Sequence, residues 1–437
     1  MKKYDEYKDS GVAWIGEVPK HWEVIKLKYK YHFQTGATPN TGKKENFEGD
    51  LRWANISDLN GSVVYDTTKH INKEAASKCS MNISPKGSLM YSFKLSVGTV
   101  AFCGEDMYTN EAIASFIPQK NDLKYLFYCA PIFIIHNANR NIYNAPLLNQ
   151  ELIKNALICL PSLNEQTAIA TYLDTHCAKI DNLISIQQKR IVLLQELKQS
   201  VITHAVTKGL NPNVEMKQSG VEWIGDVPKH WEVCKLKHYS QVVLGKMLMT
   251  SPPKDSEGLY TLEKYLKSKN VGWLQLFLDE DNIDEMWFNQ YEKSIYKLQE
   301  NDIVMNEGGD IGKVSCWRGV DFDCYIQNSI NKITADYNRV NAGFLCYWLY
   351  NLSSLGYFWS IVSQISIAHL TKEKLSNSPV VLPPITEQAA IASYLDHKCA
   401  TIDTSISNAQ HQIDLLQEYK QSLITEVVTG KRKVTDN

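Results

Sequence analysis

The chain has 437 residues, of which 44% are hydrophobic and 22% charged, and its formal net charge at pH 7 is -2. This length exceeds what one hydrophobic core usually fills, so at least two folded domains are expected. A net charge near zero excludes a protein that holds polyanions indiscriminately through a general excess of positive charge. The most apolar uncharged run, 126–135, is much shorter than the ~20 residues of a membrane span and predicts a buried helix or strand.

The N-terminus and the cysteines predict the cellular compartment of the protein. The opening MKKYDEYKDS is polar and lacks the apolar stretch of a signal peptide. The ten cysteines are scattered, with no C-x-x-C pair among them. We therefore expect a cytoplasmic protein with reduced thiols, and neither a disulfide framework nor a zinc site.

Two segments of the chain occur twice. SGVAWIGEVPKHWEV at 10–24 returns as SGVEWIGDVPKHWEV at 219–233 with two differences, and LPSLNEQTAIATYLDTHCAKID at 160–181 returns as LPPITEQAAIASYLDHKCATID at 382–403. The stretches between the paired segments differ in length and in sequence. A duplicated frame therefore holds two different inserts.

The inserts are predicted to be mixed regions with strands and turns. PKGSLMYSFKLSVGTVAF at 85–102 and ENDIVMNEGGDIGKVSCW at 300–317 both read as strand, turn, strand. Residues 1–150 carry a slight excess of basic side chains and residues 210–380 a slight excess of acidic ones. Binding to nucleic acid would therefore need basic groups gathered on one face, base contacts, or another subunit.

Each Leu-Pro segment is followed by a predicted long helix. Asn164 and Thr386 are expected N-caps, and Glu165 and Glu387 suit the positive end of the helix dipole. Mostly apolar residues then recur at alternating spacings of four and three, with eight of ten positions apolar in the first stretch and nine of ten in the second, which is a heptad pattern. The positions are Leu173, Cys177, Ile180, Ile184, Gln187, Ile191, Leu194, Lys198, Val201 and Ala205, and then Leu395, Cys399, Ile402, Ile406, Ala409, Ile413, Leu416, Lys420, Leu423 and Val427. We expect the two helices to pack together as a coiled coil, in either direction; the alternative is a solitary amphipathic helix lying on its own domain.

Motifs of enzyme chemistry fail in detail. The segment 307–314, EGGDIGKV, resembles a phosphate loop, but the glycine spacing is one residue short and Val314 replaces the required hydroxyl, so a β-turn is predicted. Dinucleotide-binding, methyltransferase and nuclease motifs are not found. The histidines form no metal-binding pattern, and His21 and His230 sit beside Trp22 and Trp231 in the duplicated opening, which indicates a structural role. We expect a non-catalytic chain with no bound metal.

Polar and basic residues of the inserts are candidate DNA contacts, because Arg, Lys, Asn and Gln read base edges and bind phosphates. The candidates are Lys43, Lys44, Arg52, Lys69, Lys94, Asn110, Arg140, Tyr143 and Asn144 in the first insert, and Lys246, Lys264, Lys267, Lys269, Lys313, Arg318, Gln327 and Asn328 in the second. For each of them alone, a solvated surface group is the alternative.

The repeated segments resemble a known family. SGVxWIGxVPKHWEV, LPxxxEQxAIAxYLDxxCAxID and LLQExKQSxIT, each present twice and in this order, are similar to segments of the specificity subunit of type I restriction-modification enzymes. The inserts also resemble the family's target-recognition domains. The resemblance lies in a recurring strand and turn pattern, formed by residues 98–100 and 109–112 in the first insert and by residues 312–314 and 327–329 in the second.

The resemblance implies an α+β fold with internal duplication and pseudo-two-fold symmetry. Target-recognition domains would occupy 1–160 and 210–382, long helices 161–209 and 383–430, and a tail 431–437. Each domain would read one half of a bipartite asymmetric DNA target. The helices, about 60 Å long at 1.5 Å per residue, would set the spacing and dock the partners. The implied partners are double-stranded DNA, two modification (methyltransferase) subunits and the restriction subunits, and S-adenosylmethionine, ATP and Mg would belong to these subunits rather than to this chain.

Two other classes of protein remain open from the residues. One is a stand-alone DNA-modifying enzyme, which a purified chain that methylates or cuts DNA unaided would establish. The other is a structural duplicated coiled-coil scaffold without DNA binding, which the near-neutral charge favours over a free-standing DNA binder.

Overall fold

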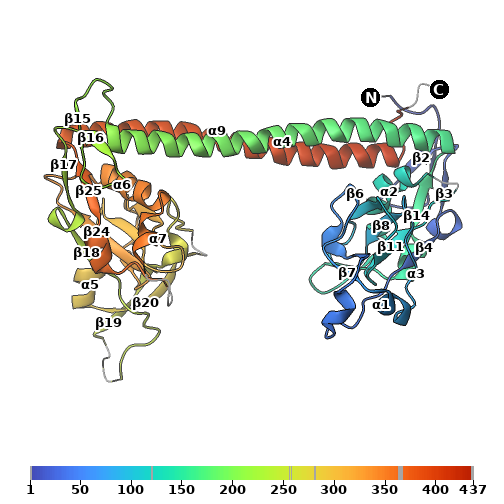
Figure 1. Ribbon diagram of the computed structural model, residues 1–437, viewed down its shortest axis with the longest axis horizontal. Coiled ribbons are helices and arrows are strands. Elements are labelled where there is room, and N and C mark those ends of the chain that lie inside the picture. The colour runs from blue at the N-terminus through green and yellow to red at the C-terminus, as the bar shows by residue number, and fades with distance from the viewer. Residues whose placement is uncertain are drawn as a thin grey trace. The chain divides into compact units, whose positions relative to one another are not determined.

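The computed structural model describes residues 2–119, 122–254, 256, 258–279, 282–362 and 368–434 (Figure 1). The chain divides into two compact units. Unit 1 is Met1–Gln187 with His411–Asn437, and unit 2 is Gln188–Gln410. Each unit therefore combines one insert with parts of both long helices.

In unit 1 the chain around the opening duplicated segment pairs with the strand that precedes the first long helix. The residues just before this segment form β1 (Tyr7–Asp9), which pairs antiparallel with β2 (Glu17–Pro19) inside it, and β3 (Glu23–Lys26) follows at its end. Strand β3 pairs antiparallel with β14 (Leu157–Leu160), which leads into the first long helix. Trp22, between β2 and β3, is completely buried. The insert of unit 1 therefore begins after β3 and ends before β14, two strands that pair with each other.

The insert of unit 1 is built on a five-stranded and a three-stranded sheet, several strands of which are labelled in Figure 1. The five-stranded sheet consists of β4 (Phe33–Thr35), β6 (Val63–Val64), β8 (Leu89–Ser92), β9 (Val100–Cys103) and β11 (Ile113–Phe116). Its strand order is β4-β11-β8-β9-β6, and only β6 and β9 run parallel in it. The three-stranded sheet has the order β10-β5-β7, from β5 (Leu51–Ala54), β7 (His70–Ile71) and β10 (Tyr108–Thr109). The strand-turn-strand prediction for 85–102 is confirmed by β8 and β9.

Short helices complete unit 1. The apolar run 126–135 lies in α2 (Leu123–His136), whose side chains are mostly buried, which confirms its prediction as a buried element. The remaining elements are η1 (Leu27–Tyr29), η2 (Lys44–Phe47), η3 (Ile56–Asp58), α1 (Lys73–Lys78), β12 (Asn139–Arg140), β13 (Pro146–Leu147) and α3 (Gln150–Asn155).

Unit 2 repeats the frame around a different insert. Its frame strands are β15 (Met216–Gln218), β16 (Asp226–Pro228), β17 (Glu232–Lys235) and β25 (Pro379–Leu382), paired as β15 with β16 and β17 with β25. The insert has an antiparallel sheet in the order β18-β24-β21-β22, from β18 (Ser240–Leu244), β21 (Ile303–Asn306), β22 (Val314–Cys316) and β24 (Ile330–Ala335).

A second sheet and short helices surround it. The sheet has the order β20-β19-β23, from β19 (Tyr260–Leu266), β20 (Asp284–Asn289) and β23 (Tyr325–Ile326). The helices are η4 (Leu236–His238), η5 (Ser268–Asn270), α5 (Gln290–Tyr296), α6 (Ala342–Ser354), α7 (Tyr357–Ile361) and α8 (Lys372–Ser376). The glycines of 307–314 lie in the turn between β21 and β22, where Gly309 and Gly312 have positive φ, so the β-turn prediction is confirmed.

The long helices are α4 (Leu163–Lys208) and α9 (Ile385–Val428). In unit 1, α4 leaves the globular part and the end of α9 returns to it, and Leu173 and Ile180 share a buried core with Leu423. In unit 2, the end of α4 shares a core with the start of α9, through Ile202 and Leu395 among others. Within each unit the helical segments therefore run antiparallel, which settles the direction that the sequence left open.

The heptad positions are buried or half-buried in both helices, including Ile184, Ile191, Leu194, Val201, Ile402, Ile406, Ile413 and Leu416. The alternative of a solitary helix is wrong, because helix packs on helix in both units.

The N-cap prediction is also wrong by two residues, since Asn164 and Thr386 lie inside the first turns. The chain turns into each helix at Ser162 and Pro384, whose carbonyl oxygens accept from the backbone N–H groups of Gln166 and Gln388.

Candidate nucleic-acid interface

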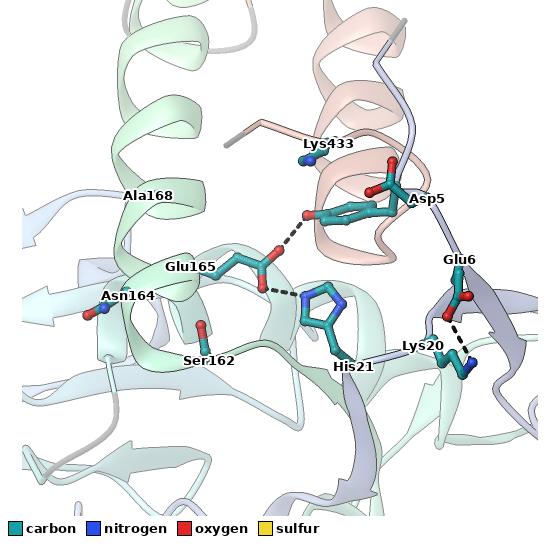
Figure 2. Close-up of a pocket in the computed structure, with 10 residues that line it drawn as sticks. Asp5, Glu6, Lys20, His21, Ser162, Asn164, Glu165, Ala168 and Lys433 are labelled. Atoms are coloured by element: carbon teal, nitrogen blue, oxygen red, sulfur yellow. Dashed lines mark hydrogen bonds and ion pairs between the residues drawn. The ribbon is translucent and has the colours of Figure 1, made fainter. Parts of the chain in front are cut away.

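The start of α4 is fixed to the frame of unit 1 by a buried carboxylate (Figure 2). Glu165 Oε1 accepts from the Tyr4 hydroxyl at 2.6 Å, and Glu165 Oε2 lies 3.0 Å from His21 Nε2. These residues line a cavity of about 780 Å³ with Lys20, Ser162 and other polar groups. Burial, with the hydrogen bond to Glu165, holds the pKa of the Tyr4 hydroxyl well above its ordinary value.

Unit 2 repeats the glutamate–histidine contact of this arrangement with its own copies. Glu387 Oε2 lies 2.8 Å from His230 Nε2 at the start of α9. The next residue acts alike in both units: Gln166 Nε2 donates to the Pro161 carbonyl at 2.9 Å, and Gln388 Nε2 to the Pro383 carbonyl at 2.7 Å. The Glu-Gln pair therefore fastens each long helix to its frame, in line with the structural role expected of the two histidines.

The lysines in the heptad stripes have partners across the helix pair. Lys420 Nζ donates to both carboxylate oxygens of Asp181 at 2.7 and 2.8 Å in unit 1. Lys198 Nζ does the same to Asp403 at 2.7 Å in unit 2. The lysine belongs to the repeated LLQExKQS segment and the aspartate to the repeated CAxID segment. These two motifs are therefore complementary parts of one antiparallel contact.

The first group of DNA candidates lies around β5, β7 and η2 in unit 1. Lys43 and Lys44 are exposed at η2, and Lys69 lies with Nζ 5.7 Å from the centre of the Phe47 ring. Arg52 on β5 lies 3.4 Å from Asp66, a carboxylate that also lies 3.0 Å from His70. The structure thus brings these four candidates to one region, although Asp66 already neutralises part of the charge.

The other candidates of unit 1 lie elsewhere. Lys94 follows β8 and lies 3.9 Å from Glu111. The Asn110 side chain accepts from the backbone N–H of Ala112 at 3.1 Å, so it shapes the turn before β11. Arg140, Tyr143 and Asn144 are exposed together on the hairpin of β12 and β13.

Lys246 requires a correction, because its side chain is only 6% exposed. Its ammonium group donates to the Trp287 carbonyl at 2.7 Å and to Glu292 at 2.5 Å. It also lies 5.0 Å from the centre of the Phe288 ring. A buried cation with these partners links the residues after β18 to β20 and α5, so this side chain is not among the proposed DNA contacts.

Most other candidates of unit 2 face carboxylates or turns. Lys267 and Lys269 both approach Asp284, and the hydrogen bond to Asp284 raises the pKa of Lys267. Arg318 lies 3.7 Å from Asp396 on α9 and so points toward the helix.

The remaining four candidates of unit 2 are partly buried. Lys313 pairs with Asp310 inside the turn that links β21 and β22, and Lys264 lies with Nζ 4.4 Å from the centre of the Phe322 ring. Gln327 accepts from the backbone N–H of Ser329 at 3.1 Å and donates to Asn328, so both side chains shape a turn. Of these partners only Phe322, beside Lys264, is distant in sequence; Asp310, Asn328 and Ser329 lie within three residues of the side chains that they contact.

Exposed apolar side chains were missed by the sequence reasoning. On the long helices, Leu193 and Leu197 are exposed in unit 2, and their duplicates Leu415 and Tyr419 are exposed in unit 1. Ile142, at the tip of the hairpin of β12 and β13, is 90% exposed. The sequence signal that could have predicted the exposed leucines is the double leucine in LLQExKQS, because its first leucine lies outside the heptad positions.

Two negative findings hold for the described residues. No helix in the part of the chain that the structure describes is long and apolar enough to cross a membrane. Among those same residues, no three or more His, Cys, Asp or Glu side chains are grouped so that they could hold a metal ion.

A duplicated frame, two different mixed inserts and a pair of long antiparallel helical segments in each unit define a two-insert scaffold protein. The family model described as the type I restriction modification DNA specificity domain matches residues 19–193 and again residues 228–413. The chain therefore belongs to the family of type I restriction-modification specificity subunits.

Individual relatives resemble the chain over most of its length. It is 24% identical over 430 residues to the type I restriction enzyme MjaIX specificity subunit of Methanocaldococcus jannaschii, covering 97% of this chain and 96% of that protein. It is 22% identical over 369 residues to the EcoBI specificity subunit of Escherichia coli, covering 79% of this chain and 75% of that protein.

Solved structures share the fold. A chain from a structural study of complex assembly and conformational transition of the type I R-M system has a TM-score of 0.71 and 14% identity, and covers 94% of this chain and 98% of its own length. The HsdS subunit from Thermoanaerobacter tengcongensis has a TM-score of 0.52 and 16% identity, and covers 95% of this chain and 98% of its own length.

Proposed function

We propose that this chain is the non-catalytic DNA-recognition subunit of a cytoplasmic type I restriction-modification complex. Each insert reads one half of a bipartite DNA target. The observation that carries the proposal is that one frame is built twice around two inserts that differ in length and in sheet composition. Two identical readers would predict a palindromic target, whereas two different readers predict an asymmetric one.

The long helices are proposed to set the spacing of the half-sites and to dock two modification subunits. Each unit presents one copy of a duplicated pair of exposed apolar side chains, Leu193 with Leu197 in unit 2 and Leu415 with Tyr419 in unit 1, spaced four residues apart on one helix face. Exposed apolar groups of this kind are typical of interaction surfaces. Because the pair occurs twice by duplication, it suits two copies of one partner.

The restriction subunits join the same assembly in this proposal. S-adenosylmethionine, ATP and Mg act on the partner subunits, and this chain contributes recognition. The fastening of each helix through Glu165 or Glu387 supports the proposal, because a reader must be held rigidly on its spacer.

Co-expression with candidate modification subunits and methylome sequencing of the host DNA test the proposal. The expected result is an interrupted, two-part methylated motif that disappears when this chain is deleted. A second test is a chain with Leu193, Leu197, Leu415 and Tyr419 replaced by glutamate, which should remain folded and lose both the partners and the motif. A motif without interruption, or one that persists in the deletion, would contradict the proposal.

A further inference from the structure

The hairpin of β12 and β13 presents apolar side chains to solvent in a fixed conformation. Ile142 is 90% exposed and Tyr143 is 83% exposed. Both belong to the tip 141–145, and the strands on either side of it are paired from Asn139 to Leu147. Large apolar groups that are held out in water, away from any core, indicate a contact surface.

The tip is held by its own hydrogen bonds. The Asn141 side chain accepts from the backbone N–H groups of Tyr143 and Ala145, both at 2.9 Å. Arg140 Nη1 donates to the carbonyl of Asn144, a residue in the left-handed conformation with φ of 60°. A preorganised loop of this kind loses little conformational freedom when it binds a partner.

The chain next to the tip in sequence suits a polyanion. No aspartate or glutamate occurs between Leu123 and Gln150, whereas His136, in the last turn of α2, and Arg140 lie close to the tip along the chain. Glu151, the next acidic residue, is hydrogen-bonded to Asn155 within α3. The side chains beside Ile142 and Tyr143 are amides and one guanidinium, which are the groups that pair with base edges.

A two-stranded ribbon fits the major groove of B-DNA, and apolar side chains there contact thymine methyl groups. We propose that the tip 141–145 enters the major groove of the half-site read by unit 1, with Ile142 and Tyr143 against the base edges. This inference rests on the proposed function and adds the element that makes the contact. Tyr143 and Arg140 were candidates from the sequence, but Ile142 and the grouping of the three come from the hairpin.

The test uses the complete complex of this chain with its modification subunits and duplexes that carry the wild-type motif. Each motif position is substituted in turn, and binding is followed by fluorescence anisotropy at one fixed salt concentration. The variant is Ile142→Ala with Tyr143→Ala. The control is Tyr29→Ala, which removes a tyrosine that is 68% exposed elsewhere in unit 1.

The double variant should bind the cognate duplex about 5- to 150-fold more weakly, the range expected for lost base discrimination. Substitutions at one or two positions of a single half-site should lose their effect, while the other half-site keeps its full profile. Thymine-to-uracil replacement at those positions should weaken the wild type and leave the double variant unchanged. Asn141→Ala, which loosens the tip, should weaken binding and keep the base profile.

Three results would overturn the inference. A double variant with unchanged affinity and profile removes the hairpin from the interface while the proposed function stands. Loss of modification subunits from the double variant identifies the tip as a protein contact instead. A wild-type complex with no sequence preference removes the proposed function and the inference together.

Discussion

Replacing Glu165 by alanine should destabilise unit 1 more than replacing Glu387 destabilises unit 2. The Glu165 side chain is 9% exposed and has two partners, whereas the Glu387 side chain is 26% exposed and lies against His230. Loss of Glu165 leaves the Tyr4 hydroxyl without its acceptor, at a cost of about 1–3 kcal/mol. The partly exposed histidine contacts add at most about 1 kcal/mol in either unit. We expect a loss of about 1–4 kcal/mol in the free energy of unfolding for Glu165→Ala and at most about 1 kcal/mol for Glu387→Ala.

Hydrogen exchange of the full chain, read by mass spectrometry, separates the two units. A single melting curve does not, because two compact units need not unfold in one step. The exchange of β3 and β14 reports on unit 1, and that of β17 and β25 on unit 2. Glu165→Gln keeps an acceptor for Tyr4 and should lose less than the alanine variant. Equal losses in the two units, or a larger loss in unit 2, would refute the reasoning.

Three further predictions follow from packing, burial and exposure. Gly36→Ala should destabilise unit 1 by about 2 kcal/mol or more, because the added Cβ would overlap the Thr109 carbonyl. Gly61→Ala should cost only about 1 kcal/mol, because no atom lies within 4 Å of the added Cβ and the only penalty is the positive φ of 77°. Urea unfolding of both variants checks this difference. Burial raises the pKa of the Cys103, Cys159 and Cys324 thiols to about 12. An unfolded thiol ionises near pH 9, so the contribution of these buried thiols to the free energy of unfolding should be complete below pH 9 and should fall as the pH rises toward 12. A urea midpoint at pH 10 that equals the midpoint at pH 7.5 would contradict this prediction. Lys420→Met should lower the free energy of unfolding by about 0.5–1 kcal/mol, because it removes the ion pair with Asp181. A double-mutant cycle with Asp181→Asn should assign most of this loss to the interaction between the two side chains. Additive losses in the cycle would show that the pair contributes nothing.

The frame and the long helices could be predicted because their signals are local or repeated. The heptad positions from Leu173 to Ala205 and from Leu395 to Val427 depend only on helix periodicity, and all are buried or half-buried. The strand pairs at 85–102 and 300–317 follow from alternation and glycine turns. The direction of helix packing did not follow, because a whole insert separates the two helices and permits either direction.

The candidate site was less accessible from the sequence. The sequence predicts Lys246 to be a surface cation, but Trp287 on β20, 41 residues further along the chain, supplies a carbonyl that accepts from its buried ammonium group. Lys267 and Arg318 are likewise paired with carboxylates that no local pattern places beside them. The hairpin that carries Ile142 escaped notice because its strands have two residues each and show no alternation.

The central claim is that two different inserts on one frame read two different half-sites. The direct test replaces residues 27–156 by residues 236–378, so that both frames carry the second insert, because β3 and β14 correspond to β17 and β25 as the borders of the insert. Methylome sequencing of cells with this chain and its modification subunits should return an interrupted palindrome of the second half-site. Retention of the original asymmetric motif by a folded, assembled chain would show that recognition lies outside the inserts.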